Sequence, residues 1–517
     1  MKTRLDSLAA RRTLLYIPLY CLVWWGIFTF SRHYLDGADL VENYAWGMEW
    51  QWGTNKHPPL FGWITAAWFR LFPFSDGAYY LLNQVNLAAA LGLLALAMHR
   101  LLSWDRVLAA IVLTTLGTHF GPDSGFKYNA NTALLPFAAG FVWSLLHALE
   151  QGRARWFVLA GVFAAAALLT KYYALVLIAA IGLSMLIALR PPAARLLKGT
   201  LIAGATALPL VWPHIAWSIH HGWPSLHYMH EAHEIPGMAG EIRAYVVAAV
   251  GVVLFCGLAL LAWGGSLIRL PSVPLDAAPR PPRVGLGMLI LSGGLTVLAA
   301  LIQGISPVSS WLIPALLFLG WALVDLTPRR FDSGRFARRI YRLGLMYLLL
   351  AVVMAMVWAS QYRAYPAPPA YALPQRVAED ATRLYHDAYG QPIEYVGGTF
   401  PLPYVMSFYS PDHPHGLYGF DLAGTDLGQS PWIDARALKS GNKVAVCGTL
   451  RFAEPSDPAC LAAARALFGP PDQTRQLIYP VYDPKTRRLG QQRYVVQMWE
   501  PRGGAAPVHA LPPAQVE

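Results

Sequence analysis

The sequence has few charged residues for its length. Only 13% of its 517 residues are Asp, Glu, Lys or Arg, whereas 55% are hydrophobic and the mean hydropathy is +0.37. Soluble globular proteins carry roughly 25% charged residues, so the deficit excludes an ordinary cytosolic enzyme and a disordered protein. Cysteine is also scarce, with four residues in the chain, which excludes a disulfide-rich scaffold. The chain has long apolar runs instead, and these predict a membrane protein.

Acidic residues are fewer than basic ones, 29 against 40, which gives a formal net charge of +11. The excess is confined to residues 1–360, which hold 26 basic and 15 acidic residues, while residues 361–517 hold 14 of each. Basic residues placed between apolar segments are typical of membrane orientation and not of a nucleic-acid surface. We therefore expect no nucleic-acid partner.

The apolar runs predict eleven transmembrane helices, because about 20 largely apolar residues span a bilayer. The predicted spans are residues 14–30, 80–99, 107–121, 132–149, 155–170, 172–189, 199–217, 244–267, 285–303, 311–326 and 343–360. The seventh and tenth contain prolines, which membrane helices tolerate when they pack against neighbours. Because no small-residue cleavage site follows Phe30, we interpret the first span as a helix and not as a signal peptide.

The distribution of Lys and Arg predicts the orientation of these spans. With the N-terminus inside, the inner segments of residues 1–360 hold twenty Lys and Arg residues and the outer segments hold six. This asymmetry follows the positive-inside rule. An odd number of spans then places residues 361–517 outside.

Residues 361–517 differ in composition from the rest of the chain. Tyr365–Pro374 is rich in proline and alanine and predicts a linker. The periodicity beyond it predicts a helix and two strands, at Arg376–Tyr389, Lys443–Cys447 and Arg493–Trp499. The predicted fold class is thus a mainly α polytopic membrane domain, residues 1–360, followed by a small outer α/β domain, residues 361–517.

The four cysteines fall into two pairs. Cys21 and Cys256 lie in predicted spans, where we interpret them as packing residues. Cys447 and Cys460 lie in the predicted outer domain. A disulfide bond between them and two free thiols are the open alternatives there.

The first outer segment, residues 31–79, concentrates carboxylates. Asp36, Asp39 and Glu42 lie within seven positions, and the last two share one face if the segment is helical. Like charges so close need a metal, a cationic substrate, or a shared proton that makes one of them a base. A solvated acidic loop is the alternative.

Cations on the same predicted side suit an anionic ligand such as a lipid phosphate. The segment 121–131 contains Asp123, Lys127 and two asparagines, and Lys171 precedes Tyr172 at the next outer turn. The alternatives are a cap for the helix that follows the asparagines and a lysine that snorkels to the interface.

Histidines recur every third residue at His227, His230 and His233. These residue types suit zinc, but their order is not the His-Glu-x-x-His of a zinc peptidase. A structural or acceptor-binding role is the other interpretation, and we expect no metal site.

Together these motifs resemble the GT-C membrane glycosyltransferases, and in particular glycosyltransferase family 39. That group includes protein O-mannosyltransferases and the bacterial lipid A aminoarabinose transferase. The resemblance rests on Asp39, nineteen positions before Pro58, and on four further motifs: Trp52-Gly53, His57-Pro58-Pro59-Leu60, Pro122-Asp123 and Thr170-Lys171-Tyr172. It also includes Trp212-Pro213-His214 and His221-Gly222-Trp223-Pro224-Ser225. The chain departs from the family pattern at Leu40, where Glu is frequent.

The resemblance implies transfer of a sugar from a polyprenyl-phosphate donor to a glycan, lipid or protein acceptor. It implies the outer face of a bacterial inner membrane, with the residue 361–517 domain in the periplasm. Asp39 is then the base and Glu42 a sugar or acceptor contact. The expected donor-phosphate ligands are Lys56, His57, Lys127 and Lys171. The expected substrate contacts are Asp123, Tyr172, His227 and His230. A direct displacement would invert the anomeric centre, and no cofactor is required, although a divalent metal is compatible.

Two other classes of function compete with an enzyme. A transporter or flippase of lipid-linked sugars would carry charges within its spans and paired broken helices. The predicted spans are nearly free of charge, and the acids gather in outer loops. A scaffold with a binding domain would leave the Asp39–Pro59 motifs unexplained.

A topology reporter tests the predicted orientation. Fused after Gln361, the reporter should be active only outside the cytoplasm, because the tail follows an odd number of spans and a positive-inside asymmetry. The predicted orientation would be overturned if this fusion gave a cytoplasmic signal and a second fusion, within Arg329–Arg342, gave a signal outside the cytoplasm.

Overall fold

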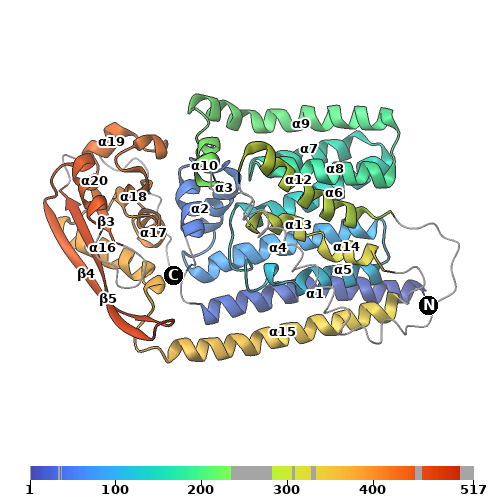
Figure 1. Cartoon of the computed structure of the whole chain (residues 1–517), viewed down its shortest axis with the longest axis horizontal. Coiled ribbons are helices and arrows are strands. Elements are labelled where there is room, and N and C mark those ends of the chain that lie inside the picture. Colours follow the sequence, from blue (N-terminus) through green and yellow to red (C-terminus); the bar gives the residue numbers. More distant parts are fainter. Residues whose placement is uncertain are drawn as a thin grey trace. The chain divides into compact units, whose positions relative to one another are not determined.

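The chain forms two compact units, Met1–Ala364 and Tyr365–Glu517 (Figure 1). The computed structural model describes residues 2–32, 35, 38–233, 282–305, 309–327, 333–448 and 457–500. Within these ranges the first unit is built from helices, and the second combines helices with a five-stranded sheet.

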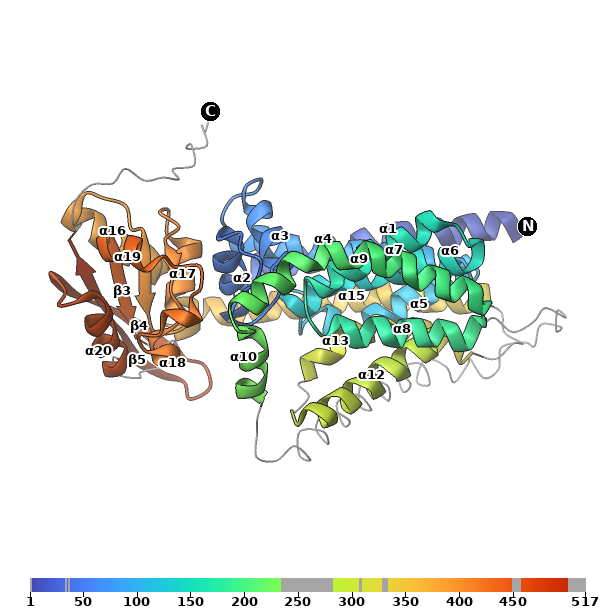
Figure 2. The same cartoon turned by 90° about the horizontal axis from the view of Figure 1, so that it is seen from above.

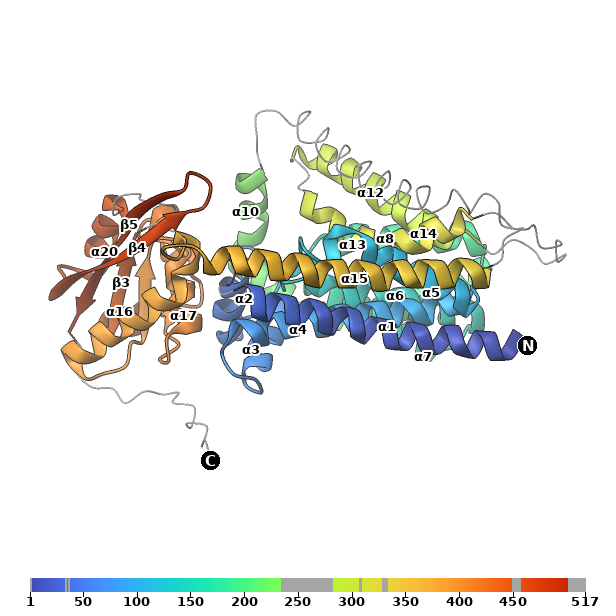
Figure 3. The same ribbon diagram turned by 90° about the horizontal axis from the view of Figure 1, so that it is seen from below.

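Long helices that lie side by side make up the first unit (Figures 1 and 3). Helix α1 packs on α4, α5 and α15, while α6 packs between α4 and α7. Helix α9 packs on α7, and α12 packs on α8 (Figure 2). The helices are α1 (Lys2–Ser31), α2 (Ala38–Met48), α3 (Leu60–Phe69), α4 (Asp76–His99), α5 (Trp104–Leu116), α6 (Ala130–Gln151), α7 (Ala154–Leu168), α8 (Ala174–Leu189), α9 (Ala193–His220), α10 (Pro224–His233), α12 (Val284–Gln303), α13 (Ile313–Leu316), α14 (Leu319–Asp325) and α15 (Ser333–Arg363).

Six helices in the described ranges are long and apolar enough to cross a membrane. They are α1, α4, α6, α9, α12 and α15, and they coincide with six of the eleven predicted spans. Helices α5, α7 and α8 occupy three further predicted spans but have 13, 15 and 16 residues, fewer than the roughly 20 that a bilayer requires. The predicted span 244–267 lies outside the described residues, so the count of eleven is not confirmed.

The predicted span 311–326 is not one continuous helix. The chain forms a 3₁₀ turn at Ser309–Leu312, then α13, which has Pro314 in its first turn, and then α14. Proline lacks the N–H that a helix interior needs, and it is favoured at a helix start. Gly320 of α14 also approaches α5 so closely that a Cβ atom would lie 1.9 Å from the Ala110 carbonyl oxygen. Packing against α5 therefore sets the path of this segment.

The segment 31–79, which the sequence predicts to be outside, contains α2 and α3. These two helices and α10 lie at the same end of the first unit (Figures 2 and 3). Helices α2 and α3 cross where Gly47 faces Gly62, and a Cβ atom on Gly47 would lie 2.0 Å from the Gly62 carbonyl oxygen. Glycine is required at this crossing, which holds α2 against α3.

The second unit is a small α/β domain, as the periodicity predicts. Its sheet has the order β2-β1-β3-β5-β4; β1 is parallel to β2 and β3, and β5 is antiparallel to β3 and β4. Helices α16 and α17 cover one face, and α18 and α20 the other (Figures 2 and 3). The elements are α16 (Pro374–Tyr389), β1 (Tyr395–Gly398), α17 (Leu402–Tyr409), β2 (His415–Gly416), α18 (Phe420–Ala423), α19 (Ala435–Ser440), β3 (Lys443–Cys447), α20 (Pro458–Phe468), β4 (Gln473–Asp483) and β5 (Arg488–Trp499).

A disulfide bond joins Cys447 at the end of β3 to Cys460 in α20. Both residues are fully buried in a core cluster that also contains Phe420 and Trp499. Of the two alternatives that the sequence left open, the bonded one is confirmed. A bond that closes a loop of this length contributes roughly 3 kcal/mol by the chain-entropy argument. It fixes α20 against the sheet.

Candidate active site

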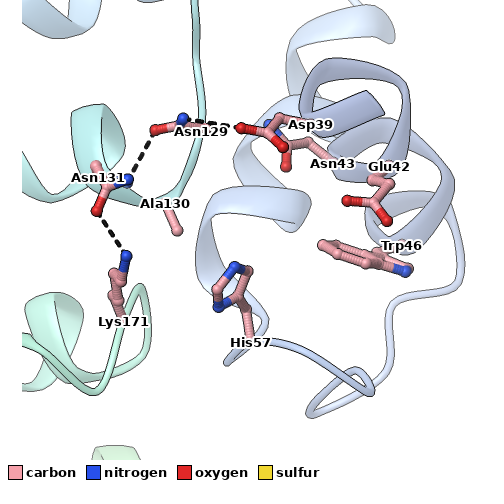
Figure 4. Close-up of a pocket in the computed structure, with 9 residues that line it drawn as sticks. All are labelled: Asp39, Glu42, Asn43, Trp46, His57, Asn129, Ala130, Asn131 and Lys171. Atoms are coloured by element: carbon pink, nitrogen blue, oxygen red, sulfur yellow. Dashed lines mark hydrogen bonds between the residues drawn. The ribbon is translucent and has the colours of Figure 1, made fainter. Parts of the chain in front are cut away.

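One face of α2 lines a polar pocket in the first unit. Asp39, Glu42, Asn43 and Trp46 recur with the three- and four-residue spacing of a helix face, so their side chains lie together. The cavity has a volume of about 50 Å³. The other lining residues are His57, Asn129, Ala130, Asn131 and Lys171, and the asparagines and Lys171 face α2 across the pocket (Figure 4).

Hydrogen bonds to the rest of the bundle hold α2 in place. The Asn43 side-chain amide donates to the Tyr128 carbonyl oxygen. The Tyr79 hydroxyl donates to the Leu40 carbonyl oxygen at 2.6 Å. Both donors and both acceptors are in buried residues, so these bonds are shielded from water.

Glu42 forms a buried ion pair with Lys56. The Lys56 Nζ atom donates to Glu42 Oε1 at 2.6 Å, and the exposed fractions of the two side chains are 9% and 5%. The rings of Tyr228 and Trp46 lie 5.1 and 5.8 Å from Nζ. Burial raises the pKa of Glu42, and the adjacent Lys56 ammonium opposes that rise. The pair anchors the loop before α3 to α2.

Thr54 gives that loop its shape. The backbone N–H groups of Lys56 and His57 donate to the Thr54 Oγ1 atom at 3.2 and 2.9 Å. The Ser225 hydroxyl of α10 donates to the Thr54 carbonyl oxygen at 2.9 Å. These bonds present Lys56 to Glu42 and His57 to the pocket.

Asn129 is the N-cap of α6 and also contacts Asp39. Its Oδ1 atom accepts the backbone N–H groups of Asn131 and Thr132, and its Nδ2 atom donates to Asp39 Oδ2 at 3.1 Å (Figure 4). The helix cap is one of the two alternatives for this segment and is confirmed. Asp39 itself is exposed, so it is accessible from outside the pocket.

Lys171 is the cation on the far side of the pocket. Its Nζ atom donates to Asn131 Oδ1 at 2.6 Å (Figure 4). Desolvation of the ammonium lowers the pKa of Lys171 to about 8, and the Asp39 carboxylate acts in the opposite direction. Lys171 is therefore mostly protonated at neutral pH and loses its proton as the pH rises through about 8.

Tyr172 links its turn to α9 and to the loop before α3. The His214 Nδ1 atom lies 2.6 Å from the Trp52 carbonyl oxygen. Since a carbonyl can only accept, Nδ1 carries the proton, and the Tyr172 hydroxyl donates to His214 Nε2 at 2.9 Å. This chain of bonds gives Tyr172 a scaffold role beside Lys171, outside the residues that line the pocket.

Lys56, which pairs with the lining residue Glu42, lies outside the pocket lining, and so do Asp123 and Lys127. The Lys127 ammonium lies 5.2 Å from the centre of the Phe126 ring. The Asp123 side chain is about half exposed, and its Oδ2 atom lies 3.8 Å from His119 Nδ1. From the segment 121–131 the pocket lining contains Asn129, Ala130 and Asn131. Phosphate binding by Lys127 and substrate binding by Asp123 stay predictions.

The histidine stretch lies on α10. The His227 side chain is exposed, and that of His230 lies outside the described residues. Among the side chains that the structure describes, no group of three or more His, Cys, Asp or Glu residues could hold a metal ion. Substrate binding by this stretch stays a prediction.

The sequence did not predict five of the nine lining residues: Asn43, Trp46, Asn129, Ala130 and Asn131. Asn43 and Trp46 follow Asp39 by four and seven positions, so helical spacing from Asp39 was a usable signal. Asn129 and Asn131 lie 90 or more positions away, and their contacts with Asp39 and Lys171 depend on how α2, α6 and α7 pack.

Residues 56–217 match the family described as dolichyl-phosphate-mannose-protein mannosyltransferase. The matched segment spans less than half of the chain and contains Lys56, His57, Asn129, Asn131 and Lys171. It supports a membrane glycosyltransferase of the GT-C type. The similarity to the aminoarabinose transferase is not confirmed. A search of curated proteins returned no significant match.

The buried ion pair predicts a specific pattern of stability. Lys56→Met and Glu42→Gln should each lower the free energy of unfolding by about 3 kcal/mol, because each removes the opposite charge beside a buried charged group. The double variant should lose less than the sum of the two, because no orphaned charge remains. Unfolding of the purified proteins in detergent measures this.

Lys198→Met is the matched control, since Lys198 is exposed on α9. Single variants that are as stable as this control would show that the Glu42–Lys56 pair does not hold the loop.

Proposed function

We propose that this protein transfers a sugar from a polyprenyl-phosphate donor to a hydroxyl acceptor at the outer face of a bacterial inner membrane. Asp39 is the general base, and Lys171 with His57 contacts the donor phosphate. The proposal includes a periplasmic location for residues 361–517. The acceptor class, whether glycan, lipid or protein, is open.

The observation that carries the proposal is which charged side chains at the pocket form an ion pair and which do not. Glu42 and Lys56 neutralise each other at 2.6 Å. Among the described residues, Asp39 and Lys171 form no ion pair with any partner, and each is held by an asparagine amide. One carboxylate and one cation are thus available to a substrate.

A carboxylate is the group that the acceptor half of this reaction needs. As the acceptor oxygen bonds to the anomeric carbon, its proton passes to an Asp39 carboxylate oxygen. The bond between the anomeric carbon and the phosphate oxygen breaks, and the polyprenyl phosphate leaves with the electron pair. A single displacement of this kind inverts the anomeric centre.

A cation is the group that the leaving half needs. The departing lipid phosphate gains negative charge, which an ammonium stabilises strongly in a poorly solvated pocket. Lys171 meets this requirement, because its ammonium has only the neutral Asn131 oxygen as its hydrogen-bond partner among the described contacts. Lys56 is less suited to the phosphate, since Glu42 already pairs with it. A metal is compatible with the scheme but is not needed by it.

Substitution of Asp39 tests the base. Asp39→Asn keeps the size of the side chain but cannot take up the acceptor proton, so kcat should fall roughly 10²–10⁴-fold with donor KM nearly unchanged. Glu42→Gln should lower kcat by a smaller factor than Asp39→Asn. The measurement is turnover of a panel of polyprenyl-phosphate sugars, mannose included, by purified variants.

Asp387→Asn, an exposed carboxylate of α16, is the matched control and should retain full activity. Near-normal turnover by Asp39→Asn would remove the base assignment.

The Lys171 pKa predicts a pH dependence of donor binding. Only the ammonium form attracts a phosphate, and the pKa of Lys171 is about 8, so donor KM should rise as the pH increases from 7 to 9. Lys171→Arg keeps its charge over this range and should flatten the rise. Donor KM measured against pH for both proteins decides the point; an identical rise in the two would exclude Lys171 as the phosphate ligand.

A further inference from the structure

The Asn129 side chain is fixed at both ends of its amide. Its Oδ1 atom accepts two backbone N–H groups, from Asn131 at 3.0 Å and Thr132 at 3.2 Å. The Thr132 hydroxyl in turn accepts the backbone N–H of Asn129 at 2.9 Å, which completes a capping box. The amide therefore has one possible orientation, with Nδ2 directed at Asp39.

That orientation determines how Asp39 is held. The Nδ2 donor lies 3.1 Å from Asp39 Oδ2, so this carboxylate oxygen acts as an acceptor. The contact occupies one of the two carboxylate oxygens. The N-terminal end of α6 also carries a partial positive charge, which favours a carboxylate nearby.

The same helical turn also holds the cation of the pocket. Asn131 lies two residues after Asn129, and its Oδ1 atom accepts Lys171 Nζ at 2.6 Å. Asp39 lies on α2, and Lys171 lies in the turn before α8. Both nevertheless form a hydrogen bond with an asparagine at the start of α6 (Figure 4). A displacement needs its base and its leaving-group cation at a defined separation, and one rigid turn supplies that separation.

We propose that Asn129 is a positioning residue that aims the Asp39 carboxylate at the acceptor hydroxyl. This inference rests on the proposed function of Asp39 as a base. Asn129 acts through Asp39 and exchanges no proton itself.

Two substitutions separate positioning from helix capping. Asn129→Ser keeps a good N-cap oxygen, but its hydroxyl is too short to replace the amide donor to Asp39. Asn129→Ala removes both the cap and the donor. Asn129→Ser should unfold at nearly the wild-type temperature, and Asn129→Ala should unfold at a lower one. Both should lower kcat roughly tenfold or more, with donor KM within about twofold of wild type.

A double variant tests whether Asn129 acts through Asp39. Asp39→Asn/Asn129→Ser should be about as slow as Asp39→Asn alone, because a base that is absent cannot be misplaced. Turnover is measured with the polyprenyl-phosphate sugar that the wild-type protein uses best.

Two results would overturn the inference. One is an Asn129→Ser variant with both wild-type stability and wild-type kcat. The other is a double variant whose loss in kcat equals the product of the two single losses. Absence of transfer by the wild-type protein with every donor in the panel would instead overturn the proposed function.

Discussion

The ion pair between Glu42 and Lys56 is the contact on which the pocket depends. A charge in a poorly solvated site is costly unless it is paired, so this carboxylate and this ammonium hold each other at 2.6 Å. The contact joins α2 to the loop before α3, and that loop is joined in turn to α10 by Ser225 and to α9 by His214. Two regions that are distant in sequence, α2 with the loop that follows it and α9 with α10, therefore meet around one neutralised pair.

The ion pair also decides which charges remain for chemistry. With Glu42 and Lys56 paired, the charges of the pocket lining that are left are Asp39 and Lys171, together with the titratable His57. Neutral amides hold both: Asn129 donates to the carboxylate, and Asn131 accepts from the ammonium. A neutral amide can orient a charged group without cancelling its charge. Under the proposed function, Asp39 would take up a proton on one side of the pocket and Lys171 would face the developing negative charge on the other.

Sequence reasoning succeeded where the signal is local. Apolar runs of sufficient length identified the six helices that can span a membrane, and alternation identified strands at Lys443–Cys447 and Arg493–Trp499 within β3 and β5. It was less accurate at 311–326, where composition predicted one span and the chain forms α13 and α14. Hydropathy averages over such a segment, whereas the position of Pro314 and the contact of Gly320 with α5 determine where its helices begin and end.

The sequence by itself, with its resemblance to a known family, predicted ten site residues, and four of them line the pocket: Asp39, Glu42, His57 and Lys171. Only the tertiary structure decided how these side chains lie relative to one another and to the rest of the pocket. It paired Lys56 with Glu42, put Asn129 and Asn131 in the pocket, and placed Asp123 and Lys127 outside its lining. The physical reason is that ion pairs and amide hydrogen bonds act over about 3 Å, a distance that separation along the chain does not encode.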